Sequence, residues 1–376
     1  MKNKLFIKII TVLLLVSAVF IFTACNDVND DNDGSNVNDD LPNEPANHDN
    51  ALTPKVVLFI GDGMGPNHVY NTELYTGEAM YFSSFATKTL VDTNSLSGMT
   101  DSSAAASAMA TGQRIYNGKV AIDGSKKPLT SITELAKRDK YGAGVVTSDE
   151  ITGATPAGFT AHALSRNNSA EILISQMVSP IDLLIGAGSY SDVYKPKFEE
   201  KGWNWVFTKD ALTTENKRFV ATFNVVNPEN GTNEEPTLTE LASYAIDYME
   251  ANYPTGYFLM IEGAKIDKAS HSNDIATMMK NQVDFSNAVK AVDEKLQSKE
   301  GGYSILVTAD HETGGLQKAN AKEEITNDLY TSTGHTPTNV PLYFKSTLTT
   351  TPTILNQELI LNTDIFTLCK ELLAID

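Results

Sequence analysis

The chain has 376 residues, of which 41% are hydrophobic, and its formal net charge is −18. This length and apolar content allow a large buried core, which excludes a fully disordered protein and leaves one large α/β domain or two smaller domains open. The acidic balance excludes a predominantly basic nucleic-acid-binding surface. It also means that an anionic ligand needs cations in its site that reverse the local field.

The first 24 residues have the pattern of a secretion signal. Three lysines precede the apolar run 9–22, and Ala24 and Cys25 complete a lipobox-like cleavage site. A transmembrane anchor is the alternative, but the apolar run is short for a membrane span. We expect a lipoprotein signal peptide at 1–24, lipidation of Cys25, and a mature protein held on the membrane of the cell envelope, outside the cytoplasm.

Residues 25–53 are rich in Asn and Asp, and the stretch 26–50 holds eight acidic residues without any Lys or Arg. Such a composition predicts a disordered tether. An EF-hand-like calcium loop is the alternative, although Asn at the first ligand position and Asp at the last disfavour it. Its ligands would be Asn29, Asp31, Asp33, Gly34 and Asp40. The only other cysteine is Cys369, so the mature domain has no internal disulfide.

From about residue 54 the chain alternates short β-branched runs with helical patterns, which predicts a sheet covered by helices on both faces. Capping boxes at 131–134 and 237–240 predict two helix starts. The region from about 190 to 235 is polar, and we expect an irregular surface excursion there.

Acidic side chains and an imidazole follow several of the apolar runs. Asp62 comes after the run 56–60, Glu262 after 257–261, and Asp310 with His311 after 304–308. Because ligands of open α/β sheets gather outside the carboxyl ends of the strands, we expect these positions to converge. Asp267 and His271 are four residues apart, so one helical turn would point both at a single metal ion.

Asp101 and Ser102 precede an alanine-rich run that ends at Gly112. One interpretation is that the serine caps a helix. The other is that it is a nucleophile at a helix N-terminus, where backbone N–H groups favour an anion. Ser103 is a rival nucleophile. Ser102 is preferred because of the resemblance described next.

These motifs, in this order and over nearly all of residues 54–346, resemble the alkaline phosphatase family, in the form of a compact bacterial member. The resemblance implies an α/β fold, a three-layer α/β/α sandwich with a large central, mostly parallel sheet, and a catalytic domain at 54–376. Only residues 312–334 separate His311 from His335, where larger relatives insert a crown subdomain. A crown is therefore expected to be absent or vestigial.

The resemblance also implies the roles of the site residues. Ser102 would be the nucleophile and Arg166 the clamp on the phosphate, with Asp101 and Lys268 as further substrate-binding residues. A lone Arg is more often a solvated charge, so this assignment depends on the motif 153–166. The implied cofactors are two Zn²⁺ and one Mg²⁺. One zinc would bind Asp267, His271 and His335, the other Asp62, Asp310 and His311, and the magnesium Asp62, Thr155 and Glu262.

The clearest departure from the family is Gly153, where relatives usually carry a side chain that supports the magnesium waters. The magnesium site is consequently expected to be weakly supported, with Lys268 as the nearest residue able to compensate. His68 and His162 are expected to be structural or surface residues.

The resemblance implies hydrolysis of small phosphate monoesters by two in-line displacements through a phosphoserine, with broad specificity. A sulfatase or phosphodiesterase of the same superfamily is the first alternative. The stretch 102–106 lacks the Pro and Arg of the sulfatase signature, and Arg166 favours monoesters over diesters. A metal- or phosphate-binding surface lipoprotein without catalysis is the second alternative. A homodimer and a monomer are both left open.

Overall fold

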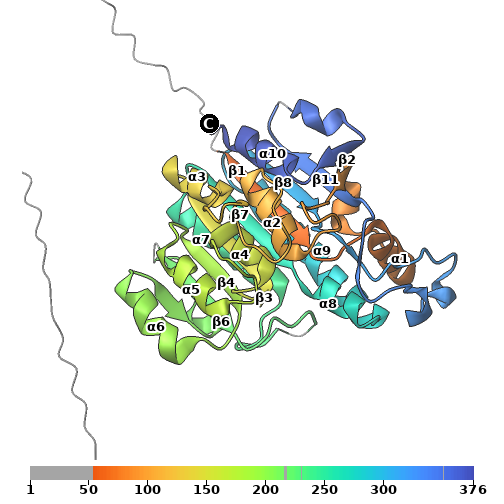
Figure 1. Cartoon of the computed structure of the whole chain (residues 1–376), viewed down its shortest axis with the longest axis horizontal. Coiled ribbons are helices and arrows are strands. Elements are labelled where there is room, and N and C mark those ends of the chain that lie inside the picture. The colour runs from red at the N-terminus through yellow and green to blue at the C-terminus, as the bar shows by residue number, and fades with distance from the viewer. Residues whose placement is uncertain (1–53, 216–217, 230, 350) are drawn as a thin grey trace, which may run out of the picture. The chain divides into compact units, whose positions relative to one another are not determined.

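The computed structural model describes residues 54–376, apart from 216–217, 230 and 350 (Figure 1). The predicted signal peptide, the lipidation site Cys25 and the acidic tether lie outside the described residues. The described residues belong to one compact unit, as a single large domain requires. Among their helices we find none with the length and apolar content that crossing a membrane demands.

Within the described residues, a ten-stranded sheet runs through the domain in the order β12-β2-β11-β8-β1-β7-β3-β4-β6-β5. The strands are β1 (Lys55–Gly61), β2 (Thr87–Asp92), β3 (Gly142–Glu150), β4 (Leu183–Ala187), β5 (Asn204–Val206), β6 (Phe219–Phe223), β7 (Tyr257–Gly263), β8 (Tyr303–Thr308), β11 (Val340–Ser346) and β12 (Leu359–Leu361). From β8 to β5 all neighbours are parallel, whereas β11 is antiparallel to both β8 and β2.

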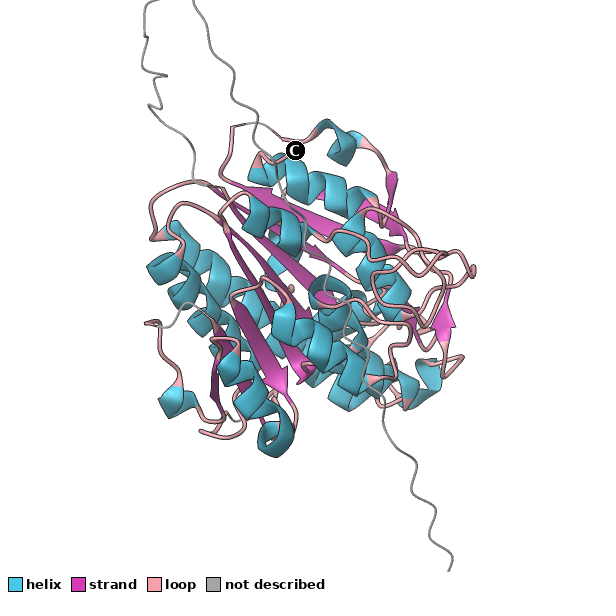
Figure 2. Cartoon of the chain, turned by 60° about the vertical axis from the view of Figure 1, so that its left-hand side comes forward, coloured by secondary structure: helices cyan, strands magenta, loops and turns pink. Residues whose placement is uncertain are grey.

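Helices cover both faces of this sheet (Figures 1 and 2). The helices α7 and α9 pack together on one face, with α8 and α1 against α9, whereas α2, α3, α4, α5 and α10 form the opposite layer. Their bounds are α1 (Pro66–Thr76), α2 (Ser102–Thr111), α3 (Ile132–Arg138), α4 (Ala154–Thr160), α5 (Ser169–Val178), α6 (Ser191–Glu200), α7 (Leu238–Asn252), α8 (Lys265–His271), α9 (Ile275–Gln297) and α10 (Asp364–Leu373). The predicted three-layer α/β/α architecture is confirmed.

The strand β1 lies in the middle of the sheet between β7 and β8, and all seven of its residues are buried. Strands enclosed on both faces are expected to be continuous apolar runs, and the sequence Lys-Val-Val-Leu-Phe-Ile-Gly is one apart from its first residue. Ile60 is in register with Glu262 on one side and Thr308 on the other. The three strands therefore end at the same level, which brings the residues that follow them together.

The two predicted capping boxes are both formed. The Ser131 hydroxyl accepts a hydrogen bond from the Glu134 backbone N–H, and the Glu134 carboxylate accepts one from the Ser131 backbone N–H, at the start of α3. Thr237 and Glu240 do the same at the start of α7. Each box satisfies two N–H groups that the first helical turn leaves without partners, so the sequence signal located both helix starts correctly.

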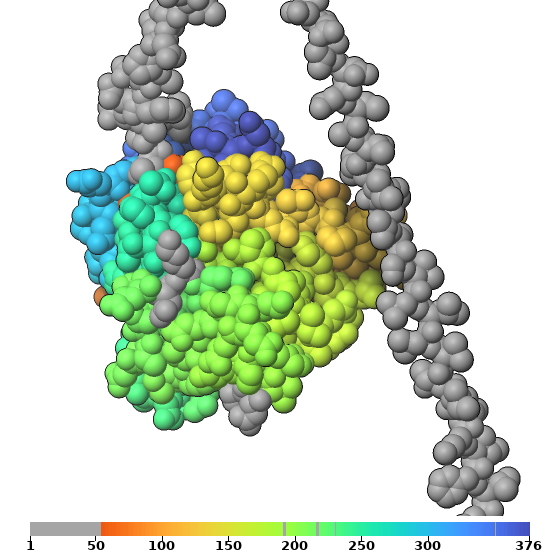
Figure 3. Space-filling model, turned by 90° about the vertical axis from the view of Figure 1, so that its left-hand side faces the viewer, coloured from red at the N-terminus to blue at the C-terminus, as the bar shows by residue number. Residues whose placement is uncertain are grey.

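The prediction of an irregular excursion between about 190 and 235 is wrong in part. This region contains α6, β5 and β6, and every residue of β6 is buried. Its strands are only three and five residues long, too short to stand out from a polar background. In the space-filling view of Figure 3 this part of the chain, in green, covers much of the face turned to the viewer.

The segment that follows His311 is short, as expected. It forms the two-residue strand β9 (Glu312–Thr313), two 3₁₀ turns, and the strand β10 (His335–Thr336), which pairs antiparallel with β9. No α-helix or larger sheet occurs in the described residues between β9 and β10, which agrees with a vestigial crown.

Candidate active site

The predicted convergence at the strand ends occurs. Asp62 directly follows β1, and Glu262 is the penultimate residue of β7. Asp310 and His311 are the second and third residues after β8. All four residues are buried. The neighbouring strands β7, β1 and β8 thus present their polar residues at one edge of the sheet, as the fold class predicts.

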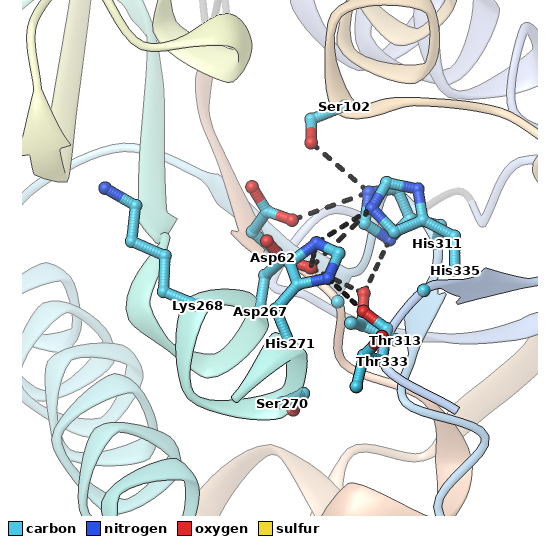
Figure 4. Close-up of polar contacts among 12 residues, drawn as sticks. Asp62, Ser102, Asp267, Lys268, Ser270, His271, His311, Thr313, Thr333 and His335 are labelled. Atoms are coloured by element: carbon cyan, nitrogen blue, oxygen red, sulfur yellow. Dashed lines mark hydrogen bonds and ion pairs between the residues drawn. The ribbon is translucent and has the colours of Figure 1, made fainter. Parts of the chain in front are cut away.

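Ser102 lies over this edge at the start of α2 (Figure 4). The Asp101 carboxylate accepts a hydrogen bond from the Ala104 backbone N–H at 2.9 Å, so Asp101 and not Ser102 is the N-cap. Freed from capping, the Ser102 hydroxyl reaches His311, with 3.2 Å between Oγ and Nε2. Ser103 is turned the other way and donates to the Asp101 carboxylate.

The first group of candidate metal ligands is Asp62, Asp310 and His311. The Nε2 atom of His311 lies 3.2 Å from Asp310 Oδ2 and 3.6 Å from Asp62 Oδ1. Both oxygens are buried, and neither forms a hydrogen bond within the described part of the chain. Buried carboxylate oxygens without partners are unfavourable unless a cation compensates them.

The second group is Asp267, His271 and His335. The His271 Nε2 atom lies 3.3 Å from Asp267 Oδ1 and 3.3 Å from His335 Nε2, and His335 Nε2 lies 3.9 Å from the same carboxylate oxygen. The rings of His335 and His311 stack with centroids 3.5 Å apart, so the two groups are adjacent. Asp267, His311 and His335 likewise have ligand atoms close enough to share an ion.

Hydrogen bonds to Nδ1 set the orientation of all three imidazoles. The Nδ1 atom of His271 donates to the Thr333 carbonyl, and that of His335 donates to the Thr100 carbonyl at 2.9 Å. The Thr313 hydroxyl donates to Asp267, so it accepts from His311 Nδ1 at 3.2 Å. This network assigns the proton to Nδ1 in each ring and leaves the Nε2 lone pair directed into the site.

The third group is Asp62, Thr155 and Glu262. The Thr155 hydroxyl, near the start of α4, is buried and forms no hydrogen bond of normal geometry within the described residues. The Thr147 hydroxyl donates to the Glu262 carboxylate from the neighbouring strand β3. Burial raises the pKa of Glu262 to about 8 despite this hydrogen bond. The carboxylate is therefore held in an environment that disfavours its charge when no cation is present.

Burial dominates the electrostatics of the other residues at this edge. Burial, then the charge of Asp310 and of two further carboxylates, raises the pKa of Asp62 well above its usual range. Burial, then the neighbouring His335, lowers the pKa of His311 to about 3. The imidazole of His311 is therefore neutral at physiological pH, which is the form that binds metals.

Arg166 is also brought to Ser102. Its Nη1 atom lies 3.2 Å from Asp101 Oδ2, and the same oxygen accepts the Gly118 backbone N–H at 2.9 Å. The guanidinium side chain is 31% exposed, so donors remain for a ligand in the site. The structure thus holds Arg166 against Asp101, the residue that directly precedes Ser102.

Among the predicted site residues that the structure describes, Lys268 points away from the ligand groups. Its ammonium group pairs with Asp149, at the end of β3, and Figure 4 shows the side chain extending away from the three histidines. Sequence reasoning missed Asp149, Thr147 and Thr313, and no motif around them signals a role. Their contacts depend on how β3, α8 and β9 approach one another.

The remaining histidines of the domain are structural, as expected. His68 is fully buried, accepts the Gly65 N–H on Nδ1 and bonds Ser270 through Nε2. His162 is partly exposed and lies 3.2 Å from Glu134. Both histidines belong to hydrogen-bond networks outside the three ligand groups described above.

The protein is thus an α/β domain in which carboxylates and imidazoles at the carboxyl ends of β7, β1 and β8 lie around a serine at a helix start. The sequence matches the model of the alkaline phosphatase family over residues 54–189 and 193–357. It is 33% identical over 297 residues to alkaline phosphatase 4 of Bacillus subtilis, a match that covers 71% of this chain and 63% of that protein. The chain therefore belongs to the alkaline phosphatase family.

Further relatives support the assignment. The chain is 25% identical to the alkaline phosphatase of Escherichia coli, over 73% of this chain and 71% of that protein. The alkaline phosphatase of the Antarctic bacterium TAB5 superimposes with a TM-score of 0.75 at 25% identity, covering 86% of this chain and 99% of that structure. The chain spans 63% and 61% of the lengths of two Bacillus subtilis relatives.

Proposed function

We propose that this protein hydrolyses phosphate monoesters through a phosphoserine formed on Ser102. One observation carries the proposal: the Ser102 hydroxyl faces the Nε2 atom of His311, where two groups of carboxylates and imidazoles meet. A serine with its hydroxyl directed at metal-ligand side chains can be activated without a dedicated base. Membership of the alkaline phosphatase family points to the same chemistry.

The residues present fit metal ions. The His271 and His335 Nε2 lone pairs face each other at 3.3 Å, an arrangement that is repulsive unless a cation lies near both. The unpartnered buried oxygens of Asp62, Asp310 and Thr155 have the same requirement. Imidazole and carboxylate sets suit Zn²⁺, whereas an all-oxygen set suits Mg²⁺.

We therefore assign one zinc to Asp267, His271 and His335, and the other to Asp62, Asp310 and His311. The magnesium is assigned to Asp62, Thr155 and Glu262. When bound, these ions would lower the pKa of the attacking oxygens and neutralise the charge that develops on the phosphoryl group.

The chain's own residues supply nucleophile, orientation and product binding. The Ser102 oxygen attacks phosphorus and gives up its proton, the bond from phosphorus to the alcohol oxygen breaks, and the alcohol leaves once its oxygen has gained a proton. Water then attacks the phosphoserine from the opposite side, which releases phosphate and restores the Ser102 hydroxyl. Arg166, held by Asp101, can grip two phosphoryl oxygens with its free donors, and the first turn of α2 adds backbone N–H groups.

These contacts act on the phosphoryl group and leave the alcohol largely free, so we propose broad specificity. A phosphodiesterase is the nearest alternative. The position of Arg166 beside the nucleophile disfavours it, because a diester offers the guanidinium one charged oxygen fewer. A metal-binding protein without catalysis would have no need of a nucleophile at this position.

The direct test is a phosphomonoesterase assay on the full chain, with p-nitrophenyl phosphate and added Zn²⁺ and Mg²⁺. We expect turnover, and covalent phosphate on Ser102 after an acid quench. Ser102→Ala is the matched control and should yield no phosphoprotein. A wild-type protein that binds both metals and phosphate but shows neither turnover nor phosphoprotein would contradict the proposal.

We also propose that the protein is held on a membrane of the cell envelope, outside the cytoplasm, by lipid on Cys25, as the sequence pattern at 1–25 predicts. The test is detergent phase partitioning of the cell-expressed protein. Wild type should enter the detergent phase and Cys25→Ser should stay in the aqueous phase. Equal partitioning of the two would contradict the anchor.

A further inference from the structure

The ion pair between Asp149 and Lys268 joins two elements that both contribute to the proposed site. Asp149 is the penultimate residue of β3, and Lys268 directly follows the ligand Asp267 on α8. The distance between Oδ1 and Nζ is 2.5 Å, with Asp149 22% and Lys268 55% exposed. The pair therefore lies at the rim of the site and is open to solvent.

Asp149 is itself held in place. Its backbone N–H donates to the Thr147 hydroxyl at 2.9 Å, and that hydroxyl donates to Glu262. Asp149 is thus fixed to the same carboxylate that is proposed to bind magnesium. Lys268, with its long side chain, is the partner that can move.

The pair also lies in one hollow with the proposed phosphate clamp. A hollow of about 350 Å³ has Arg166 in its wall together with Asp149, Lys268 and Gly153. Once released from Asp149, Lys268 would be the second cation of this hollow, facing the same anion as Arg166.

A side chain at position 153 would require a shift of the backbone beside this pair. A Cβ atom at Gly153 would lie 2.9 Å from the Glu150 carbonyl oxygen, closer than such atoms approach without a backbone shift. The Gly153 N–H also donates to this carbonyl at 2.8 Å, which closes the tight turn after β3. Position 153 thus favours glycine, and Asp149 is the carboxylate that pairs with Lys268.

We propose that Asp149 is a positioning residue that holds Lys268 away from the phosphate and thereby weakens phosphate binding. The inference rests on the proposed function, since it assumes that the hollow beside Arg166 receives the phosphoryl group. A cation paired with a fixed carboxylate is less available to a second anion. The consequence is faster release of the product.

The test measures inorganic phosphate in two ways: as a competitive inhibitor of p-nitrophenyl phosphate hydrolysis, and by calorimetric titration of the metal-loaded full chain. In Asp149→Asn, Lys268 is free to contact phosphate. The new, partly exposed ion pair should lower the inhibition constant and the dissociation constant of phosphate about fivefold. The KM should fall with them. Asp149→Glu, which keeps a carboxylate near Lys268, should return the constants toward those of wild type.

Two controls separate this effect from a general loss of negative charge. Glu150→Gln removes the adjacent carboxylate, which accepts a hydrogen bond from Tyr190 instead of pairing with Lys268. Glu150→Gln should change the inhibition and dissociation constants of phosphate by less than about twofold, because exposed charges are screened. In a Lys268→Met background, Asp149→Asn should no longer strengthen phosphate binding, since the coupling runs through Lys268.

An unchanged or higher phosphate constant in Asp149→Asn would overturn the inference, as would an equal gain in the Lys268→Met background. If wild type hydrolyses monoesters and all variants bind phosphate alike, only this inference fails. If phosphate binding depends on Asp149 as described but no monoester is hydrolysed, only the proposed activity fails.

Discussion

The Asp101 carboxylate caps the helix that begins at Ser102 and, through its second oxygen, holds Arg166 at 3.2 Å. One side chain therefore sets the position of both the proposed nucleophile and the proposed phosphate clamp. Because the cap and the ion pair use different oxygens of one carboxylate, suitable substitutions can separate them.

Asp101→Ala should lower the free energy of unfolding by about 1 kcal/mol, because the first turn of α2 loses its cap. Asp101→Ser keeps a capping oxygen and should lose less stability, but neither variant can hold Arg166. Both should therefore raise the inhibition constant of phosphate, by about threefold for the loss of one partly exposed contact. Urea denaturation and phosphate inhibition check the two effects. Equal stability of the two variants would contradict the capping role.

Ser102→Ala should lower kcat by on the order of 10³-fold or more, as removal of a nucleophile usually does. Ser103→Ala removes only hydrogen bonds to Asp101 and should cost about 1 kcal/mol of stability with a small effect on kcat. Acid-quench phosphorylation and steady-state kinetics distinguish them. If Ser103→Ala lowered kcat more than Ser102→Ala, in a protein that still folds and binds zinc, the assignment of Ser102 as the nucleophile would be wrong.

Removal of the metals should make stability depend on pH. With a folded-state pKa of about 8, Glu262 holds more protons in the folded than in the unfolded protein. The stability of the metal-free protein should then fall as pH rises from about 4.3, the usual value for Glu, and level off once pH exceeds the folded pKa. Thermal denaturation after chelation, across this range, checks the slope.

Glu262→Gln is the matched control for this slope, since it keeps the shape and removes the charge. The metal-free variant should lose less stability between pH about 5 and about 9 than the metal-free wild type. Readdition of Zn²⁺ and Mg²⁺ should restore wild-type stability most strongly at high pH. A metal-free wild type that is equally stable across the range would argue against an uncompensated buried carboxylate.

Arg166→Ala should weaken the binding of phosphate and of monoesters while sparing diesters, because a diester offers fewer charged oxygens to the guanidinium. Arg166→Lys should recover only part of the loss, since an ammonium cannot grip two oxygens at once. The measurement compares kcat/KM on p-nitrophenyl phosphate and bis-p-nitrophenyl phosphate. Equal losses on both substrates would remove Arg166 from the clamp role.

The convergence of Asp62, Glu262 and Asp310 was predictable from the sequence, because each follows an apolar run and parallel strands end at one edge. The orientation of the imidazoles was not, since it depends on the Thr333 carbonyl and the Thr313 hydroxyl, which reach the site only in the folded chain. The sequence predicted which residues come together at this edge of the sheet, whereas their hydrogen-bond partners required the structure.

The same contrast applies to Lys268 and to the strand β6. Lys268 was expected to serve the phosphate or the magnesium waters, yet it pairs with Asp149, 119 residues earlier in the chain. No local pattern encodes such a pairing. The strand β6 was missed because its five buried residues follow a polar stretch, and its place in the sheet is determined by β4 and β5 on either side.

The last prediction concerns Gly153, whose missing side chain was expected to leave the magnesium site weakly supported. Activity of wild type should therefore depend on added Mg²⁺, with zinc held saturating. Gly153→Asp would add a carboxylate and a good N-cap at the start of α4, which has no side-chain cap in wild type. The contact of 2.9 Å between its Cβ and the Glu150 carbonyl opposes these gains.

Gly153→Ala isolates the steric effect, because it adds the Cβ without the carboxylate. We expect the alanine variant to lose stability, by about 1 kcal/mol for a backbone shift of this kind. The aspartate variant should bind Mg²⁺ more tightly than the alanine variant, because its carboxylate can hold the magnesium waters. Magnesium titrations of wild type and both variants, followed by activity and by thermal stability, make the comparison. Stoichiometric magnesium in dialysed wild type, with no difference between Ala and Asp at 153, would show that the site is already well supported.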